Sequence, residues 1–159
     1  MKDKDKESSS VITTNREAGR DYFILETLEA GIALGGCEVK SLRDKQASLS
    51  GSFARIDGGE LFLYHAYIAP YEMGGRENLE PLRKRKLLVH RSQLHKLAAK
   101  TQEKGLLLVP LKMYFNEQGL AKVELAVVKG KKSFDKRADI KERSARREID
   151  RAIKNRNRR

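Results

Sequence analysis

The sequence predicts a mainly β protein: a closed antiparallel β-barrel of about six strands, two or three flanking helices and a flexible basic C-terminal tail. Alternating apolar residues bounded by glycine-containing turns recur through the middle of the chain, where only one long segment has helical periodicity. The last 31 residues hold 14 basic and 5 acidic side chains, a net charge of +9. With 159 residues in all, we expect a disordered arm over 1–14, a barrel over 15–128 and the tail over 129–159.

The first part of the barrel is predicted from a long strand and a short helix. Strand-forming residues fill 22–34, and Gly31 would let that strand bend at a barrel corner. Two adjacent glycines then end the strand. Residues 37–43 suit a short helix, because Val39 and Leu42 lie three positions apart on one helical face.

A β-hairpin is predicted next, around the Asp-Gly-Gly turn at 57–59, where glycine accepts a positive φ without strain. It joins a strand over 52–56 to a strand over 60–68. The second strand has apolar side chains on both faces, so we expect another layer of structure to cover it. A loop with two adjacent glycines follows over 70–80.

One longer helix is predicted before the last hairpin. Apolar and small residues recur with helical spacing between Leu94 and Thr101, and Ser92 is a candidate N-cap. This helix interrupts five or six strands that are mostly joined by hairpins, which favours an OB-fold-like barrel. A ferredoxin-like sandwich would need two long helices.

The last hairpin has the clearest pattern. Apolar residues alternate over 107–115, the chain turns at 116–119, and Val123 and Leu125 point to one face on the return. Pro110 predicts an edge position or a β-bulge in the outgoing strand, because proline has no N–H to donate.

The tail combines a helical charge pattern with few apolar residues. Asp139–Arg143, Glu142–Arg146 and Asp150–Lys154 are acid-to-base pairs at i, i+4, the favourable order on a helix. The accompanying apolar stripe is too narrow to dock firmly on the barrel. We therefore predict a tail that is disordered when free and helical when laid on an anion. A membrane surface is the alternative, although large apolar anchors are few.

Composition argues against several classes of protein. No segment approaches the roughly 18 apolar residues that span a bilayer, and residues 1–10 lack the apolar core of a signal peptide. Cys37 is the single cysteine, and the three histidines show no metal-ligand spacing. No nucleophile elbow or phosphate loop is recognisable. We expect a cytoplasmic protein that is not an enzyme and uses no cofactor or metal.

The excess of basic residues predicts a polyanionic partner. Residues 83–86 are four consecutive cations, and Lys129, Lys131 and Lys132 follow the last predicted strand. Phe134 is the only aromatic residue of the tail, and a ring among cations can stack on a nucleic-acid base while the charges hold phosphates. The alternatives are a tail that serves solubility alone and a Phe134 ring that folds back on the barrel.

An ordered set of short motifs extends from about Asn15 to near the C-terminus. The set consists of Asn15-Arg16, Asp21-Tyr22-Phe23-Ile24, Glu29-Ala30-Gly31, Glu38-Val39-Lys40-Ser41-Leu42-Arg43, Arg85-Lys86-Leu87-Leu88, Lys129-Gly130-Lys131-Lys132 and Asp135-Lys136-Arg137. No single motif is specific, but together and in this order they resemble SmpB, the SsrA-binding protein family of bacteria.

The resemblance implies an RNA-binding adaptor with an oligonucleotide-binding barrel. SmpB proteins bind the tRNA-like domain of transfer-messenger RNA (tmRNA, or SsrA RNA) and carry it, with elongation factor Tu, into a stalled ribosome. Their tail lies as a helix in the empty mRNA channel near the decoding centre of small-subunit rRNA and stands in for codon–anticodon pairing. This process, trans-translation, releases the ribosome and tags the incomplete peptide. The resemblance thus implies a monomer whose partners are tmRNA and the stalled ribosome, with elongation factor Tu reached indirectly through aminoacylated tmRNA.

The resemblance also implies two sets of site residues. The tmRNA-binding set is Asn15, Arg20, Glu29, Leu88 and Lys122. The ribosome-binding set in the tail is Lys129, Lys131, Lys132, Phe134, Asp135, Lys136 and Arg137. Two positions depart from the family pattern: Arg20 stands where His is common, and Phe134 where Tyr or His is frequent. The positive charge and the planar ring are kept, while the hydrogen bonds of the usual residues are lost.

Two other functions remain open from the sequence. One is a generic OB-fold protein that binds single-stranded RNA or associates with ribosomes. The other is an RNA-modifying enzyme in which Glu29 or Asp21 acts as the base, although no cofactor site supports it.

Overall fold

The computed structural model describes residues 11–103 and 105–158. Its strands are β1 (Val11–Thr14), β2 (Tyr22–Ile32), β3 (Ala47–Ser48), β4 (Phe53–Asp57), β5 (Glu60–Tyr64), β6 (Tyr67–Ile68), β7 (Arg85–Leu88), β8 (Leu106–Phe115) and β9 (Ala121–Gly130). Its helices are α2 (Arg16–Asp21), α3 (Gly36–Arg43), the 3-10 turn η1 (Gly75–Glu77), α4 (Arg91–Thr101) and α5 (Ser133–Asn157).

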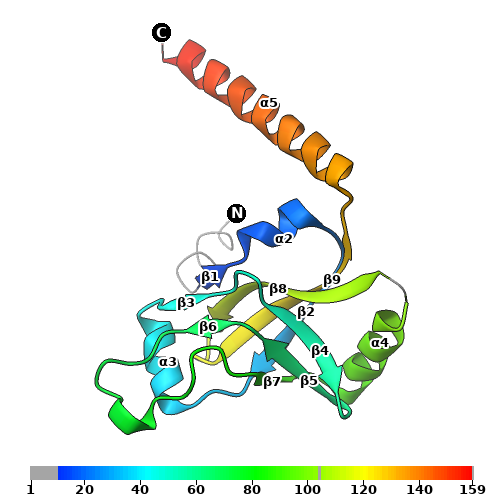
Figure 1. Cartoon of the computed structure of the whole chain (residues 1–159). Coiled ribbons are helices and arrows are strands. Elements are labelled where there is room, and N and C mark those ends of the chain that lie inside the picture. The colour runs from blue at the N-terminus through cyan, green and yellow to red at the C-terminus, as the bar shows by residue number, and fades with distance from the viewer. Residues whose placement is uncertain (1–10, 104, 159) are drawn as a thin grey trace.

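Six strands form a closed ring (Figure 1). They hydrogen-bond in the order β8-β4-β5-β7-β2-β9, and β9 pairs again with β8. Every pair is antiparallel. β1 adds to the free edge of β8, and β3 and β6 form a separate two-stranded sheet. The predicted mainly β architecture, with about six strands in the main sheet, is confirmed.

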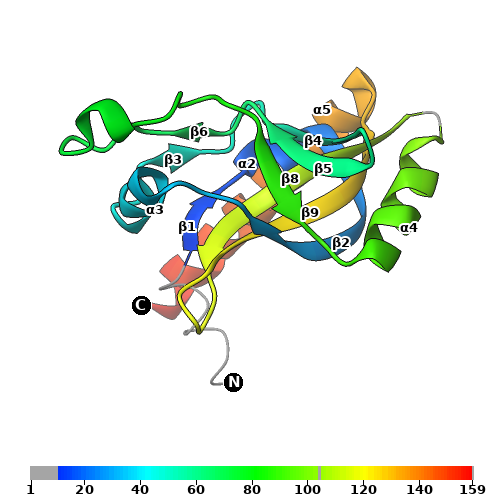
Figure 2. The same cartoon turned by 90° about the horizontal axis from the view of Figure 1, so that it is seen from below.

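The helices cover different parts of the ring. Figure 2 shows α4 at one end, and α3 with the β3–β6 sheet at the other. α2 lies on the outside of β8 and β9, where Ala18 packs against Val109, Ala126 and Val128. Among the described residues, α2, α3 and α4 therefore cover only part of the outer face of β2, β8 and β9.

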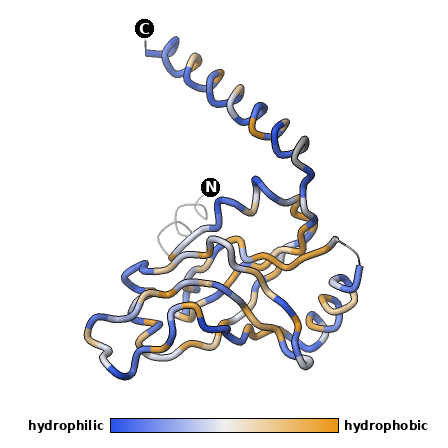
Figure 3. Tube along the Cα trace, in the orientation of Figure 1, coloured by the Kyte–Doolittle hydropathy of each residue, from blue (hydrophilic) through white to orange (hydrophobic). Residues whose placement is uncertain are grey.

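The core fills the interior of the ring. Alternate residues of β5, β8 and β9 point inward, and Leu63, Met113, Val123 and Leu125 are completely buried. The hydropathy colouring follows the same division, with the apolar residues concentrated in the strands and α5 largely hydrophilic (Figure 3). Burial of these side chains is the main favourable contribution to folding.

Both predicted hairpins are confirmed, with one correction. Pro110 lies at a register shift between β8 and β9, which is the predicted bulge. The strand predicted over 60–68 is two strands, β5 and β6, which belong to different sheets. His65 adopts a φ of 59° between them, and this left-handed conformation interrupts the extended chain.

The ordered region begins earlier than predicted. Residues 11–14, assigned from the sequence to the disordered arm, form β1, and the side chain of Ile12 is buried in the core. β8 is long enough to pair with β4, β9 and also β1, and its exposed edge gives this short apolar segment a partner. The remainder of the predicted arm, 1–10, lies outside the described residues.

The tail forms one helix of 25 residues, α5, which extends away from the ring of strands (Figure 1). Its three isoleucines, Ile140, Ile149 and Ile153, are about half exposed. Among the described side chains, the narrow apolar stripe therefore does not dock on the ring of strands. That the tail is disordered when free stays a prediction.

A buried ion pair joins α3 to β7. The Arg85 side chain is 1% exposed, and its Nε lies 2.6 Å from Oε2 of Glu38. The remaining Arg85 N–H groups donate to the carbonyls of Ala66 (2.7 Å), Arg83 (3.2 Å) and Pro81 (3.0 Å). The prediction that the four consecutive cations of 83–86 suit a polyanionic partner is thus wrong at Arg85, which faces inward.

Glu38 is held in its ionised form by three donors. Burial alone would raise the pKa of this carboxyl group, but hydrogen bonds from Arg83, the Gly35 N–H and Arg85, together with the Arg85 charge, lower it below its ordinary value. The pair is therefore stable as two charges despite its removal from water.

We predict that Glu38→Gln lowers the free energy of unfolding by about 3–5 kcal/mol at neutral pH, because Arg85 becomes a buried, unpaired charge. In the parent protein this contribution is complete above the ordinary carboxyl pKa of 4.5 and is lost as the pH falls through the lower folded-state pKa. Urea titrations between pH 3 and 7 measure both effects. Glu60→Gln, which removes an exposed pair with Lys86, is the control and should cost less than about 1 kcal/mol. Equal losses in the two variants would contradict the prediction.

Candidate nucleic-acid interface

A row of four paired residues crosses the outer face of the ring. Leu88 on β7 pairs with Gly31 on β2, Gly31 pairs with Lys122 on β9, and Lys122 pairs with Tyr114 on β8. Directly paired residues of antiparallel strands share a face of the sheet. Leu88 and Lys122, which are far apart in the sequence, are thereby brought to the two sides of one glycine.

This row passes through a groove of about 570 Å³. The groove is lined by Thr27, Leu28, Glu29, Gly31, Leu88, Val89, His90, Gln93 and Lys122. Three of the five residues predicted to bind tmRNA, namely Glu29, Leu88 and Lys122, thus share it. The other two do not line it.

Gly31 lies close to Leu88 in the floor of the groove. A Cβ atom at Gly31 would lie 3.3 Å from the Leu88 Cβ, a contact tight enough to force that side chain to move. Leu88 is 51% exposed and forms an apolar wall beside the charged side chain of Lys122. An apolar surface next to a cation suits a nucleotide, whose base is apolar on its face and whose phosphate is anionic.

Glu29 contacts two other polar residues of this face. Its Oε2 accepts a hydrogen bond from the Tyr114 hydroxyl, and its Oε1 lies 4.0 Å from the Lys122 ammonium. The Lys112 ammonium lies 5.3 Å from the centre of the Tyr114 ring. A carboxylate is unfavourable beside phosphates in isolation, but here it holds a lysine and a tyrosine in place on the surface.

Asn15 connects β1 and α2 to β8, outside the groove. Its backbone N–H donates to the Leu111 carbonyl at 2.7 Å, and its side-chain N–H donates to the Pro110 carbonyl at 3.0 Å. The side-chain oxygen of Asn15 is buried and has no hydrogen-bond partner among the described residues. Asn15 therefore anchors the chain at the β8 bulge.

Arg20 also lies outside the groove, on α2. Its side chain is 51% exposed and pairs with Asp21 at 3.2 Å. An exposed ion pair of this kind contributes little to stability, so the guanidinium can exchange its carboxylate for a phosphate at small cost.

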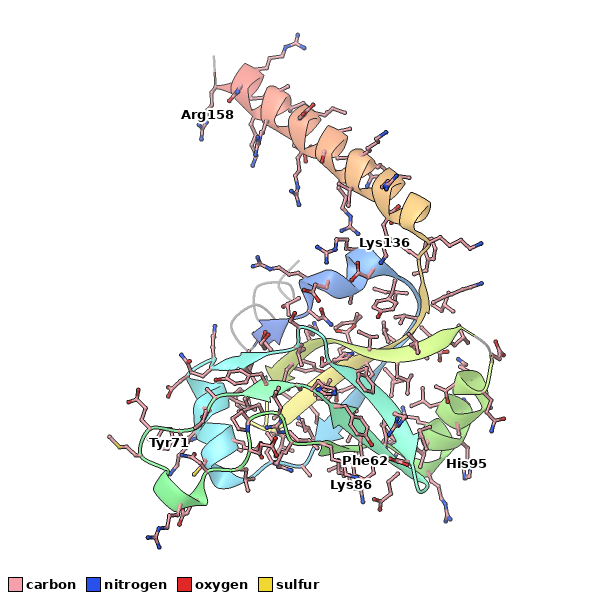
Figure 4. The ribbon with its side chains drawn as sticks, in the orientation of Figure 1. Phe62, Tyr71, Lys86, His95, Lys136 and Arg158 are labelled. Carbon is pink, nitrogen blue, oxygen red and sulfur yellow. The ribbon has the colours of Figure 1, made fainter. Side chains whose placement is uncertain are left out.

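The predicted ribosome-binding residues differ in exposure. Lys129, Lys132 and Arg137 are exposed, whereas the Lys131 side chain is 5% exposed. Lys136 lies near the base of α5 (Figure 4) and is 3.6 Å from Asp21. Phe134 and Asp135 belong to α5, but their side chains lie outside the described residues.

Among the residues that sequence reasoning did not single out are His90 and Gln93 in the groove and Tyr114 beside it. Tyr114 could have been found, because it alternates with inward-facing Met113 on the mixed face of the last hairpin. His90 and Gln93 reach the groove only because α4 begins where β7 ends. No local pattern signals that placement.

The described parts of the chain, 11–103 and 105–158, lack two features. No group of three or more His, Cys, Asp or Glu residues there could hold a metal ion. No helix in the same parts is long and apolar enough to cross a membrane.

Comparison with known proteins identifies the family. The family model described as "SmpB protein" matches residues 12–155. The chain belongs to the SmpB family. It is 59% identical over 146 residues to the SsrA-binding protein of Moorella thermoacetica, covering 92% of this chain and 94% of that protein. It is 60% identical over 146 residues to the SsrA-binding protein of Pelotomaculum thermopropionicum, covering 92% and 95%.

A solved structure of the SmpB family is also similar. It is described as "tmRNA-SmpB: a journey to the center of the bacterial ribosome" and is 58% identical in sequence, with a TM-score of 0.65. The match covers 76% of this chain and 85% of that chain. The sequence resemblance to SmpB is therefore confirmed.

Proposed function

We propose that this protein is the RNA-binding adaptor of trans-translation. It binds the tRNA-like domain of tmRNA, delivers it to stalled bacterial ribosomes, and inserts its C-terminal tail in the empty mRNA channel in place of codon–anticodon pairing. Ribosome rescue and peptide tagging follow. Membership of the SmpB family over residues 12–155 carries this proposal.

The barrel supplies the site for the tRNA-like domain. We assign it to the OB-fold type and extend its N-terminal boundary to include β1. The Lys122 ammonium binds a phosphate, Leu88 packs on an unstacked base, and Glu29 orients Lys122 and Tyr114. Asn15 supports the neighbouring backbone, and Arg20 adds a flanking cation. Recognition of this kind depends on RNA shape and phosphate position more than on base sequence.

The tail supplies the ribosome site. α5 is basic and largely exposed, which suits a channel lined by rRNA phosphates. Lys129, Lys132, Lys136 and Arg137 provide cations at its base, and the Phe134 ring is positioned in the sequence to stack on a base. The tail is disordered away from the ribosome and becomes ordered in the channel.

The proposed cycle involves binding steps without chemical turnover by this protein. It needs no cofactor, takes place in the cytoplasm and uses a monomer. Elongation factor Tu is reached indirectly, through the aminoacyl end of tmRNA.

A generic single-stranded RNA-binding role is the second candidate, and one surface favours it. On the outer face of β4 and β5, the Arg55 guanidinium lies 4.9 Å from the Tyr64 ring centre, and Tyr64 stacks on Phe53 at 5.3 Å. Lys84 lies 4.5 Å from the Phe62 ring centre. Aromatic rings among cations are the pattern that binds unpaired bases.

Competition binding at several salt concentrations separates the two candidates. We predict that unstructured RNA of equal length does not displace the tRNA-like domain at equimolar concentration. The plot of log K against log salt should have a slope of about −4 to −7, for five to eight phosphates. Equal affinity for both RNAs would favour the generic role.

We predict that Lys122→Ala weakens binding of the tRNA-like domain about ten-fold and makes the salt slope shallower by about one, because one phosphate contact is lost. The melting temperature should stay unchanged, since Lys122 lies on the outer face. Lys96→Ala, at an exposed position of α4 outside the groove, is the matched control. Loss of the cooperative melting transition would instead identify Lys122 as structural.

Glu29→Gln provides a second test of the groove. If Glu29 acts by orienting Lys122, Glu29→Gln should weaken binding of the tRNA-like domain less in the Lys122→Ala background than in the parent protein. The coupling energy between the two substitutions should exceed about 0.5 kcal/mol. If the double variant loses the sum of the binding free energies lost by the two single variants, Glu29 contacts RNA independently of Lys122.

We predict that deletion of residues 131–159 leaves affinity for the tRNA-like domain within about three-fold, because the groove residues remain and surface effects are small. Peptide tagging on ribosomes stalled without a stop codon should be abolished. Filter binding and a tagging assay measure the two activities. Parallel loss of RNA binding and tagging would overturn the division between barrel and tail.

A further inference from the structure

We propose that a second phosphate-binding site for the tRNA-like domain lies beside Leu88, formed by Lys86 of β7 and Arg91 of α4. Glu60 of β5 occupies Lys86 when RNA is absent and weakens RNA binding at this site. The inference rests on the proposed function and deepens it, because it assigns a further contact to the same RNA and one side chain of the protein that opposes this contact.

The register of β7 places Lys86 on the outer face of the ring, next to the groove. Lys86 and Leu88 are separated by one residue, and alternate residues of a strand share a face. Both are exposed, whereas Leu87 between them is buried in the core. Lys86 also pairs with Phe62 of β5, and the two residues lie near each other in Figure 4. The outer face therefore continues from Leu88 to Lys86 and onto β5.

A second groove, of about 330 Å³, lies on the β5 side of Leu88. Lys86, Glu60 and Arg91 line this Lys86 groove. The groove that contains Lys122 lies on the β2 side, and Leu88 lines both of them. The exposed Leu88 side chain is therefore a ridge with a lysine-containing groove on each side.

Glu60 places a carboxylate where a phosphate would bind. Its Oε1 lies 3.0 Å from the Lys86 ammonium, and the side chains of Lys86 and Glu60 are 46% and 50% exposed. An ion pair this exposed contributes little to stability, so Lys86 can exchange the carboxylate for a phosphate at small cost. The displaced carboxylate stays in the same groove, where its charge repels the phosphate. Glu60 therefore lowers the affinity for RNA, in contrast to the orienting role proposed for Glu29.

Arg91 supplies the second cation of the Lys86 groove. It is exposed and belongs to α4, whereas Lys86 belongs to β7. A guanidinium can donate two parallel N–H groups to one phosphate, and the Lys86 ammonium adds a point charge. A phosphate between the two residues is thus held from two elements of the fold, which fixes the position of the RNA relative to the ring.

Charge and continuity favour RNA as the occupant of the Lys86 groove. The charged residues that line it are Lys86, Arg91 and Glu60, so two positive charges and one negative charge leave a net attraction for an anion. Every internal nucleotide of an RNA strand has a phosphate on each side. A base that packs on Leu88 therefore has a phosphate available for each groove, whereas an isolated anion would occupy one groove alone.

The competing interpretation is that the Lys86 groove receives an acidic side chain of a ribosomal protein. Lys86 and Arg91 would then affect peptide tagging on ribosomes without affecting the binding of isolated RNA. Measurements with purified RNA distinguish the two occupants.

The test is binding of the purified tRNA-like domain to the full-length protein at several salt concentrations. Lys86→Ala and Arg91→Ala should each weaken binding about five-fold and make the slope of log K against log salt shallower by about one. Arg91→Lys should keep about half of the parent affinity or more, because the charge remains. Lys96→Ala, at an exposed position of α4 outside both grooves, is the matched control and should leave the affinity within about two-fold of the parent value.

Glu60→Gln should have the opposite effect. Loss of the opposing carboxylate should tighten binding of the tRNA-like domain about two- to three-fold. The gain should be smaller in the Lys86→Ala background, because the phosphate is then held less firmly beside position 60. Glu103→Gln, which removes an equal charge from an exposed position outside both grooves, should leave the affinity unchanged. Weaker binding by Glu60→Gln would overturn the role assigned to Glu60.

Phosphate ethylation interference locates the contacts on the RNA. Ethylation removes the charge of one phosphate, so positions at which it blocks binding are the phosphates that the protein holds. Arg91→Ala should lose the interference at one position, and Lys122→Ala at a different one. An interference pattern of Arg91→Ala identical to that of the parent protein would overturn the second site. An unchanged melting temperature in each variant excludes unfolding as the cause of weaker binding.

The second site and the proposed function can fail separately. If Lys122→Ala weakens RNA binding while Lys86→Ala and Arg91→Ala do not, the second site is refuted and the proposed function stands. Reduced tagging by Lys86→Ala and Arg91→Ala with unchanged RNA affinity would overturn the assignment to RNA and identify an acidic protein partner. A parent protein that binds the tRNA-like domain no better than unstructured RNA would refute the proposed function itself.

Discussion

The buried pair between Arg85 and Glu38 is the interaction on which the rest of the structure depends. A guanidinium on the inner face of a barrel strand is tolerated only because a carboxylate from α3 and three carbonyls satisfy it. These contacts determine which residues of β7 face inward. A one-residue slip would move Arg85 to the surface and turn Leu88 away from the groove. The same pair therefore sets the register of the core and the location of the proposed RNA site.

The proposed RNA-binding groove lies on a part of the chain that is nearly neutral. The 128 residues before the tail have 20 basic and 17 acidic side chains, so net charge alone gives this part little attraction for a polyanion. Local geometry compensates: Gly31 leaves a floor, Leu88 adds an exposed apolar wall, and Glu29 holds Lys122 between paired strands. Shape and one well-placed cation take the place of a broad basic surface.

The tail, in contrast to the preceding residues, has a large excess of basic side chains. It carries most of the net charge, and the described side chains of α5 are mainly exposed, so long-range attraction acts chiefly through this segment. Such a segment has too little apolar surface to fix its own orientation.

Local patterns in the sequence were enough to indicate the two hairpins, an edge position or a bulge at Pro110, the helices α3 and α4 and the basic tail. Turn residues and apolar periodicity act over a few positions, so these features can be predicted locally. The ordered motifs were enough to indicate the SmpB family. Only the tertiary structure decided that Arg85 is buried while its neighbours Lys84 and Lys86 are exposed, that β1 joins the sheet, and that Lys131 turns toward α2. In each case the partner lies tens of residues away, as Glu38, β8 and Gly19 do. The residues next to a charged or apolar side chain in the sequence do not indicate which distant group it will contact in the folded protein.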